Sequence, residues 1–394
     1  MKALLAALPF RRLLATILLG FPLLAAAAPT PEDRLSRVFE AIEANKLDDA
    51  MKRVDELIRD YPNFRLAHLV RGDLLLARSR PLLTFGNVVK TVPQEKIDGL
   101  RAEALARLRA HRQRPAEDRL PRQVLQLHSG QKHVFLVDSR RSRLYVFAND
   151  EGKPRLIADF YVTLGKNGIE KTREGDQKTP VGVYHVTANL PRRKLTDFYG
   201  AGAFPINYPN EWDKRQGRNG FGIWLHGVPS DVYSRPPRAS DGCIVLSNPD
   251  LESVGQYVQV GMTPVIIADE VEWIDAAALE AERASLAGAI ERWRADWESR
   301  DTERYLAHYS ARFAAPGQNL AAWSEHKRKV NGAKSFIKVG ISRVSMLSYP
   351  RERDFVVVTF EQDYRSSGLS NKMRKRQYWV KEAGAWKIIY EGAG

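Results

Sequence analysis

The chain has 394 residues, of which 44% are hydrophobic, and this composition is typical of a globular protein with two or three domains rather than a disordered, collagen-like or coiled-coil chain. A net charge of +14 is spread along the chain and favours acidic partners such as nucleic acid, an anionic membrane or an anionic polymer. The sequence lacks Cys/His zinc-finger spacing, so we expect no nucleic-acid partner. A single cysteine, Cys243, excludes an internal disulfide framework and a multi-cysteine metal site.

The N-terminus has the pattern of a secretory signal peptide. Three basic residues precede an apolar run over 13–24, and small alanines follow it. We expect cleavage after Ala27, so that residues 1–27 form the signal. The alternative is an uncleaved membrane anchor, but the run is shorter than the ~20 residues that a spanning helix needs. We therefore expect a periplasmic protein, or one otherwise exported to the cell envelope.

Residues 30–125 are predicted to form a helical module. The spacing of apolar residues predicts three helices, the second capped by Asp48 and Asp49 and the third over 64–77. Small alanines between larger apolar residues resemble tetratricopeptide hairpins, with a plain helical packing module as the alternative. The basic stretch over 101–114 is expected to be the solvated face of a further helix.

Residues 126–270 are predicted to form a β-rich domain with long loops. Short apolar runs alternate there with Gly and Pro, a pattern typical of strands and turns. Long loops in a compact domain usually carry function. The expected strands lie at 134–137, 144–147, 160–164, 181–186, 223–225 and 265–268.

Residues 275–394 have an α+β pattern, with helices first and an antiparallel meander after them. We expect a long helix over 276–300 and a short one over 305–313, followed by strands at 336–347, 355–364, 376–381 and 386–390. Five aromatic residues at helical spacing are expected to pack as a core over the sheet, with a sugar-binding pocket as the alternative. They are Trp293, Trp297, Tyr305, Tyr309 and Phe313.

One pair of residues in the β-rich domain carries the chemistry. A predicted strand ends at His226, where Gly227 turns the chain, and 16 residues separate His226 from Cys243. A neighbouring imidazole can take the proton of a thiol and leave a nucleophilic thiolate. We therefore expect Cys243 and His226 to be catalytic, although either residue alone would more often be structural.

The backbone around this pair is expected to assist. A carbonyl near Gly227 is the expected partner of the second imidazole nitrogen, with Asp241 as another candidate. Gly242 leaves the backbone unobstructed, so its N–H and that of Cys243 are expected to face a developing oxyanion.

The loop between His226 and Cys243 supplies candidate substrate-binding residues. Paired hydrogen bonds from Arg235 or Arg238 could clamp a carboxylate or phosphate, with a solvated loop as the alternative. The remaining candidates surround the pair: Tyr233, Ser240, Asp241 and Trp224.

The run from His226-Gly227 through Ser240-Asp241-Gly242-Cys243 resembles the signature of YkuD-type L,D-transpeptidases. The upstream Gly165-Lys166 and Thr179-Pro180-Val181-Gly182 resemble that family's early strands, so that the resemblance covers residues 126–270. It implies a β-rich catalytic fold, in which His226 activates Cys243, and peptidoglycan stem peptides as substrates.

In the reaction that the resemblance implies, the thiolate attacks the carbonyl of the L-centre of a diamino acid and expels the terminal D-Ala. An amine then resolves the thioester of Cys243 to give a cross-link, which is our first expectation. The alternative is an L,D-carboxypeptidase, in which water resolves the same thioester and trims tetrapeptide to tripeptide in cell-shape control.

Two positions depart from the family's pattern. Many members carry a second His where this chain has Asp241, and an Arg where it has Val245. Binding of the substrate carboxylate is therefore expected to fall to Arg238 or Arg235, and the departures also favour an altered outcome, including hydrolysis.

The C-terminal segment, 275–394, resembles the nuclear transport factor 2-like (NTF2-like) cone fold. A catalytic domain followed by such a cone resembles the L,D-carboxypeptidases that shape curved or helical bacterial cells. A tetrapeptide motif in this segment, Ser324-Glu325-His326-Lys327, matches the S-x-x-K pattern of penicillin-binding proteins but lacks the accompanying S-D-N and K-T-G elements, so we assign it no role.

A hypothesis from another class is a non-catalytic wall-binding scaffold built on the helical module and the cone. The presence of both Cys243 and His226 argues against it. We expect no cofactor and no metal, since the eight histidines are scattered. Peptidoglycan stem peptides are the expected partners, with a wall-anchored protein or other wall-synthesis proteins as further candidates.

Overall fold

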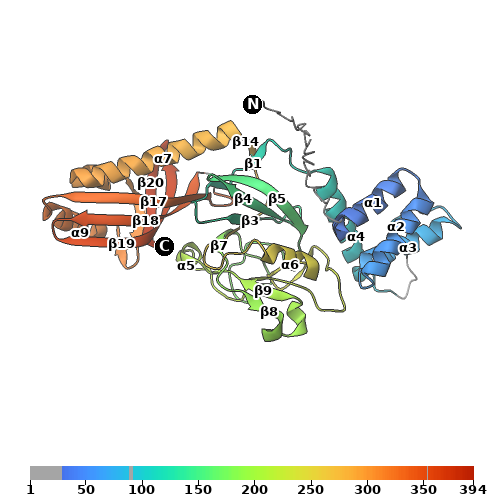
Figure 1. Ribbon diagram of the computed structural model, residues 1–394. Helices are drawn as coiled ribbons and strands as arrows, with labels where there is room; N and C mark the ends of the chain where they lie inside the picture. Colours follow the sequence, from blue (N-terminus) through green and yellow to red (C-terminus); the bar gives the residue numbers. More distant parts are fainter. Residues whose placement is uncertain (1–28, 88–91, 353) are drawn as a thin grey trace, which may run out of the picture.

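The computed structural model describes residues 29–87, 92–352 and 354–394 (Figure 1). The signal peptide predicted over 1–27 lies outside the described residues. The chain forms an N-terminal helical segment, a central β-rich domain and a C-terminal α+β domain, which confirms the predicted fold class. Within these described ranges, no helix combines the length and apolarity needed to cross a membrane.

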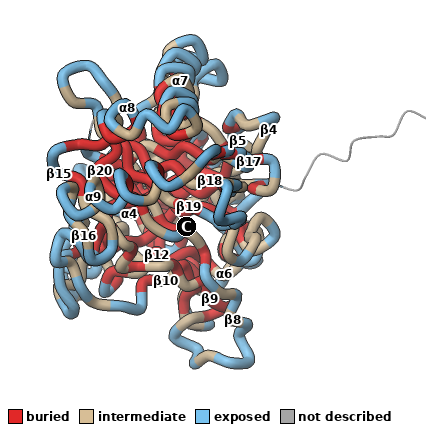
Figure 2. The backbone as a smooth tube through the Cα atoms, turned by 90° about the vertical axis from the view of Figure 1, so that its left-hand side faces the viewer, coloured by how far each residue is buried: buried red, intermediate tan, exposed pale blue. Residues whose placement is uncertain are grey.

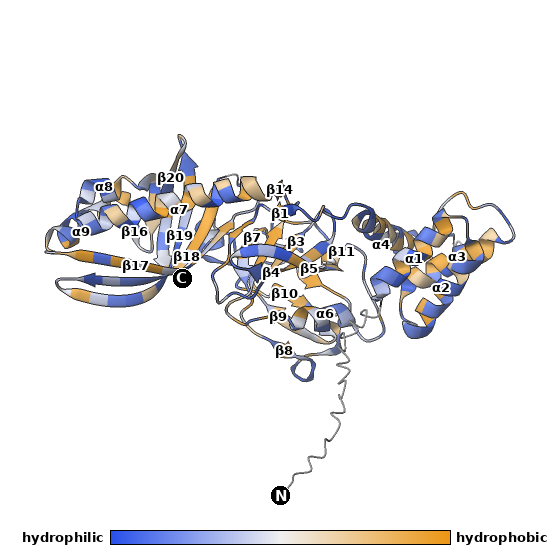
Figure 3. Cartoon of the chain, turned by 45° about the horizontal axis from the view of Figure 1, so that its top comes forward, coloured by the Kyte–Doolittle hydropathy of each residue, from blue (hydrophilic) through white to orange (hydrophobic). Residues whose placement is uncertain are grey.

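The N-terminal helical segment contains four helices that pack around a common apolar core. Both hydrophobic and hydrophilic residues occur on these helices (Figure 3), as amphipathic helices require. Thr30 caps the first helix in a capping box with Asp33. The helices are α1 (Pro31–Glu43), α2 (Leu47–Asp60), α3 (Arg65–Ala77) and α4 (Gln94–Arg112).

Two expectations for this segment were wrong. Asp48 and Asp49 do not cap α2, because the helix begins at Leu47 and places both carboxylates in its first turn, where the helix dipole favours them. The basic stretch of α4 is not wholly solvated, because Arg107 is buried against the rest of the protein.

The segment that follows α4 contains strands where we expected helix. The strand β1 (Arg119–Pro121) pairs with β14 (Trp273–Asp275), and β2 (Val124–Gln126) joins the C-terminal sheet. These two strands therefore tie residues 119–126 to parts of the chain that come much later in the sequence.

The central domain has a five-stranded sheet in the order β5-β4-β3-β13-β7. Its other strands form a four-stranded sheet in the order β12-β10-β9-β8 and a pair, β6 with β11, and two short helices, α5 (Glu211–Arg215) and α6 (Asn248–Gly255), lie beside them. The strands are β3 (His133–Asp138), β4 (Arg143–Asp150), β5 (Lys153–Tyr161), β6 (Leu164–Gly165), β7 (Gly182–His185), β8 (Leu190–Pro191), β9 (Gly202–Pro205), β10 (Trp224–His226), β11 (Arg238–Ser240), β12 (Ile244–Val245) and β13 (Pro264–Ala268).

The C-terminal domain packs helices against a curved sheet in the order β16-β15-β20-β19-β18-β17-β2. Figure 1 shows α7 running along this sheet. Its elements are α7 (Ala276–Ser299), α8 (Thr302–Leu306), β15 (Tyr309–Ala315), β16 (Gln318–Asn319), α9 (Leu320–Gly332), β17 (Ile337–Ser348), β18 (Phe355–Ser366), β19 (Leu369–Glu382) and β20 (Ala385–Ala393).

The predicted helix over 305–313 was wrong in its second half. Tyr309 and Phe313 lie on strand β15 and are buried in the core. Residues four apart share a face in a strand as well as in a helix, so their spacing could not distinguish the two. Helix α9 was not predicted at all.

A common apolar core joins the central and C-terminal domains. Trp212 of α5 lies with its ring centroid 4.7 Å from that of Phe355 and 5.4 Å from that of Tyr378. Figure 2 shows that burial concentrates in the sheets while the outer loops remain exposed. The five-stranded sheet of the central domain and the C-terminal sheet therefore share one apolar core.

We predict that Trp212→Ala destabilises the protein by about 3–5 kcal/mol, because it leaves a cavity where the two domains meet. Urea unfolding followed by fluorescence measures this change. Phe221→Ala is the control, since that ring is 73% exposed and its loss should change stability by only about 0.5 kcal/mol or less. An equal effect of the two substitutions would contradict the role assigned to Trp212.

Candidate active site

Parallel pairing of β10 with β12 brings the two predicted catalytic residues to one edge of the four-stranded sheet. His226 is the last residue of β10 and pairs with Val245 of β12. Cys243 immediately precedes β12. The 16 residues between His226 and Cys243 thus form a loop that returns the chain to the neighbouring strand.

His226 is buried and held by the backbone. Its Nδ1 lies 2.7 Å from the carbonyl oxygen of Gly227, so Nδ1 carries the proton and donates it, and Nε2 is left as the acceptor. Burial and, to a smaller extent, the Arg235 cation lower the pKa of His226 to about 4, against the opposing effect of the hydrogen bond to the Gly227 carbonyl. The imidazole is therefore neutral at pH 7 and able to accept a proton.

The Cys243 thiol is half-buried and donates to the carbonyl oxygen of Gly222 at 3.3 Å. Burial raises the pKa of the thiol, and the charge of Asp241 adds to this, against the opposing effects of the Trp224 backbone N–H and Arg235. Among the described residues, no hydrogen bond joins Sγ to His226. At neutral pH the pair is therefore a thiol and a neutral imidazole rather than an ion pair.

The turn before Cys243 is braced by Ser240. The Ser240 hydroxyl donates to the carbonyl oxygen of Cys243 at 2.7 Å and accepts from the Gly242 N–H at 3.2 Å. Two expectations were therefore wrong: Ser240 is buried inside the turn rather than open to substrate, and the Gly242 N–H is occupied. The Cys243 N–H, which donates to no described acceptor, is left as the amide for an oxyanion.

Both glycines of the motif are required by close packing. Gly242 has φ +123°, and a Cβ there would lie 2.6 Å from the carbonyl oxygen of Lys178. A Cβ on Gly227 would lie 2.1 Å from Oδ1 of Asn248. Neighbouring atoms thus lie too close to Gly242 and Gly227 for a side chain at either position.

Two predicted substrate-binding residues point elsewhere. The guanidinium of Arg238 donates to the carbonyl oxygen and hydroxyl of Ser139, both at 2.9 Å, on the turn between β3 and β4. Tyr233 is buried against the N-terminal helical segment, with its ring centroid 4.2 Å from that of Phe64. In the loop between His226 and Cys243, these two residues therefore contact other parts of the protein rather than the candidate site.

Asp241 and Trp224 lie near the pair. Asp241 is exposed, and its Oδ1 lies 3.1 Å from Nζ of Lys166. The ring of Trp224 lies 4.9 Å from that of Tyr199, which in turn lies 5.1 Å from the imidazole of His226. An acidic group and an aromatic wall therefore border the site.

Arg235 is the cation of the site. It acts electrostatically on both His226 and Cys243, and its guanidinium lies 5.0 Å above the ring of Phe198. Burial lowers the pKa of Arg235, and no carboxylate of the described residues lies within ion-pair distance of it. A partly desolvated cation that Asp241 influences only electrostatically, without a close ion pair, is suited to bind an anionic substrate group.

The sequence reasoning missed the loop that covers Cys243 from the other side. Lys171 is buried, donates to Oδ1 of Asp176 at 2.8 Å, and lowers the pKa of Cys243. Although burial opposes it, hydrogen bonds from Lys171 and three backbone N–H groups hold the pKa of Asp176 at about 2. No local pattern distinguishes these residues from other loop charges. Only Thr179, which accepts from the Gly165 N–H at 2.9 Å, belonged to a motif that the sequence had shown.

We predict that the rate of alkylation of Cys243 by iodoacetamide rises continuously from pH 6 to above pH 8.5. The rate should not reach a constant maximum at acidic pH. The thiolate is the reactive form, and burial raises the pKa of this thiol above the usual value of about 8.5. Since Cys243 is the only cysteine, the alkylation rate of the whole protein reports on it. A rate already maximal at pH 5 would instead indicate a preformed thiolate–imidazolium pair.

Comparisons with known proteins agree with this geometry. Residues 132–267 match the model of the YkuD family, the L,D-transpeptidase catalytic domain, and residues 285–392 match the Cds6 C-terminal NTF2-like domain. A search of curated proteins returned no match.

Two solved structures resemble most of the chain. Bd1075 of Bdellovibrio bacteriovorus is 32% identical with a TM-score of 0.62, and the match covers 70% of this chain and 98% of Bd1075. The helical cell shape determining protein Pgp2 of Campylobacter jejuni is 28% identical with a TM-score of 0.59, and the match covers 69% of this chain and 95% of Pgp2. The chain therefore belongs to the L,D-transpeptidase family, as a peptidoglycan-modifying enzyme of the cell envelope with a YkuD catalytic domain and a C-terminal NTF2-like domain.

Proposed function

We propose that this protein is exported and acts as an L,D-carboxypeptidase that trims peptidoglycan stem tetrapeptides to tripeptides. The observation that carries the proposal is that β10 and β12 bring His226 and Cys243 to one edge of a sheet, while the Arg235 guanidinium lies 5.0 Å from the ring of Phe198, which itself lies 5.8 Å from the imidazole of His226. These groups supply a nucleophile, a base and a cation for the carboxylate of the terminal D-Ala. The predicted signal over 1–27 supports export to the periplasm or another part of the envelope.

Substrate binding is assigned to Arg235 rather than Arg238. Arg238 donates to Ser139, whereas the guanidinium of Arg235 lies over the ring of Phe198, which packs 5.8 Å from the imidazole of His226. Its charge-assisted hydrogen bonds to the terminal carboxylate would place the preceding amide carbonyl beside Sγ.

Acylation begins when the thiol turns from Gly222 O toward the imidazole. Nε2 of His226 takes the proton, Sγ attacks the amide carbonyl carbon, and a C–S bond forms. The Cys243 N–H stabilises the resulting oxyanion. As the C–N bond breaks, the protonated imidazole returns the proton to the amine of D-Ala, which leaves as a neutral amine.

Deacylation repeats these roles with water. Nε2 of His226 takes a proton from a water molecule, the hydroxide oxygen attacks the thioester carbon, and the C–S bond breaks. The sulfur then regains its proton from His226. The products are the tripeptide carboxylic acid and the free thiol, so the enzyme is restored. The carbonyl of Gly227 keeps the imidazole in the tautomer that both steps need.

The resemblance of a catalytic domain followed by an NTF2-like cone to the cell-shape L,D-carboxypeptidases supports water as the acceptor. A solved structure similar to this chain is the helical cell shape determining protein of Campylobacter jejuni, and the match covers 69% of this chain and 95% of that protein. Transfer to an amine, which would make a cross-link, is the second candidate because the catalytic family is named for it.

We predict that the purified protein converts disaccharide tetrapeptides to tripeptides and that Cys243→Ala abolishes the conversion. Mass spectrometry of muropeptides measures both products. Cross-linked or amine-exchanged products would replace the carboxypeptidase proposal by transpeptidation. Untouched substrate with both proteins would contradict either enzymatic proposal and favour a scaffold.

We predict that Gly242→Ala reduces turnover by about 100-fold, because a displacement of about 1 Å at a catalytic group costs this much. Its Cβ would meet the Lys178 carbonyl, so the turn that aims Cys243 must shift. Gly217→Ala is the matched control, since Gly217 also has a positive φ, +70°, but has nothing within 4 Å of the added Cβ. Equal activities of the two variants would refute the close-packing explanation.

A further inference from the structure

The loop between β10 and β11 is held on its outer side by the N-terminal helical segment. Asn63 donates its side-chain N–H to Ser230 O at 3.1 Å, and its carbonyl oxygen accepts from the Tyr233 N–H at 3.3 Å. The Tyr233 ring packs against Phe64 and Tyr61. Residues about 170 positions apart in the sequence therefore form one packed contact.

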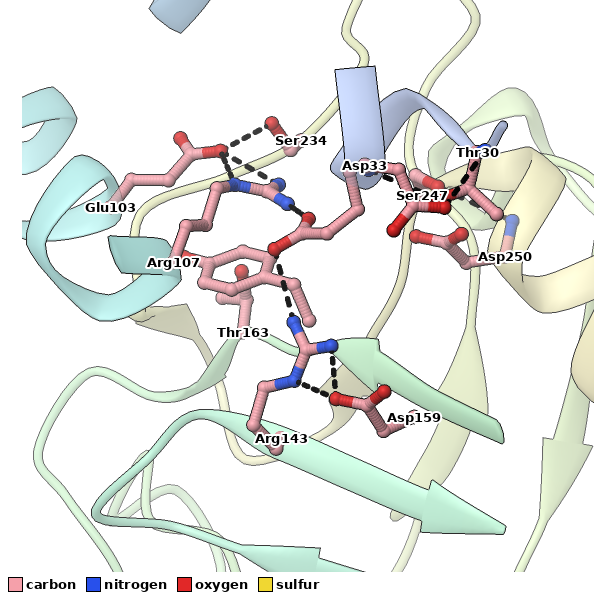
Figure 4. A network of polar contacts seen from close by, with 12 residues as sticks. Thr30, Asp33, Glu103, Arg107, Arg143, Asp159, Thr163, Ser234, Ser247 and Asp250 are labelled. Carbon is pink, nitrogen blue, oxygen red and sulfur yellow. Dashed lines mark hydrogen bonds and ion pairs between the residues drawn. The ribbon is translucent and has the colours of Figure 1, made fainter. Parts of the chain in front are cut away.

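Helix α4 contacts the centre of the same loop. Glu103 is 1% exposed and accepts from the Ser234 hydroxyl at 2.7 Å, while the guanidinium of Arg107 donates to the same oxygen at 2.9 Å and 3.0 Å. Figure 4 shows Ser234 and Arg107 converging on Glu103. The hydroxyl of Ser234 is thus fixed by a buried ion pair, which is a rigid support.

The ion pair is part of a larger network that joins the helices to the central sheet. Glu32 of α1 bridges Arg107 of α4 and Arg143 of β4. Figure 4 shows that Arg143 also pairs with Asp159 of β5. Such buried charges are costly when one partner is removed, so the network fixes how α4 lies against the sheet.

The residue next to Ser234 is Arg235, and its backbone is fixed as well. The Arg235 carbonyl oxygen accepts from Tyr161 OH and Thr163 Oγ1, both at 2.9 Å. The guanidinium of Arg107 in turn lies 4.0 Å from the Tyr161 ring. The backbone of Arg235 is therefore linked to α4 through Tyr161, which contacts Arg107, and through the neighbouring Ser234, while its guanidinium lies over Phe198 beside His226.

On the following residue the contact is close to its steric limit. A Cβ added to Gly99 of α4 would lie 2.8 Å from Cγ of Pro236. The proline ring is tied to its own backbone, so it cannot yield without moving the loop. Helix α4 thus approaches the loop as closely as a residue without a side chain allows.

We propose that the N-terminal helical segment positions Arg235 to recognise the terminal carboxylate of the stem peptide. Ser234, Pro236 and Tyr161 transmit the position of α4 to the backbone of Arg235, and they act as positioning residues rather than catalytic ones. The inference rests on the proposed function, because it assumes that Arg235 binds the substrate carboxylate. It assigns the helices to substrate selection at an active site that they do not themselves line.

The test compares binding of a stem tetrapeptide with binding of its C-terminal amide by calorimetry. All variants are made in the full chain carrying Cys243→Ala, so that no turnover occurs. We expect the parent to prefer the carboxylate by about 10-fold or more, and Arg235→Gln to bring the ratio close to one. Gly99→Ala and Ser234→Ala should each reduce the preference at least about threefold, a partial loss of that same charge-assisted interaction.

Two controls separate positioning from a general loss of structure. Gly72→Ala makes the same change in α3, where the added Cβ has nothing within 4 Å, and should leave the ratio unchanged. Ser234→Thr keeps the hydroxyl and should restore the preference. A general structural defect would weaken binding of both peptides equally and leave the ratio intact.

The outcomes distinguish this inference from the proposed function. If Arg235→Gln abolishes the preference but Gly99→Ala and Ser234→Ala retain it, positioning by the helices is wrong and the role of Arg235 stands. If the parent does not prefer the carboxylate, both the role of Arg235 and this inference are overturned. Turnover in the protein with Cys243 intact is measured separately, so a failure of catalysis does not affect the binding ratio.

Discussion

The parallel pairing of β10 with β12 is the constraint on which the site depends. It places His226, at the end of β10, beside the start of β12, which Cys243 immediately precedes, although 16 residues separate the two in sequence. The turn through Ser240 and Gly242 then aims the thiol, and the carbonyl of Gly227 fixes the imidazole. The residues between Gly227 and Ser240 do not take part in these hydrogen bonds. This part of the loop carries Arg235 and contacts the N-terminal helical segment.

Burial determines the protonation state of the pair. It lowers the pKa of His226 and raises that of Cys243, so both changes favour the neutral forms. A protonated thiol is also less exposed to oxidation than a thiolate, because the thiolate is the reactive form. Both groups of the pair are therefore held in their neutral forms, which for the thiol is the less reactive one.

Local patterns in the sequence predicted the fold class and singled out Cys243 and His226 as a candidate pair, because strand periodicity and the His-Gly and Ser-Asp-Gly-Cys spacing are encoded locally. The choice between Arg235 and Arg238 was not accessible, since it depends on contacts with Ser139 and Phe198 that are distant in sequence. Tyr233 was misassigned for the same reason, because its partners Tyr61, Asn63 and Phe64 lie in the turn between α2 and α3. The helix predicted over Tyr309 and Phe313 was wrong for a different reason, since their spacing fits a strand as well as a helix.

Reaction in water labelled with oxygen-18 tests the central claim most directly. Mass spectrometry would follow both the intact protein after rapid quenching and the released peptide. The account predicts a hydroxylamine-sensitive peptide adduct on Cys243 and a tripeptide carrying one oxygen-18 atom in its new carboxylate. A tripeptide formed without an adduct on Cys243, or products without the label, would contradict the account.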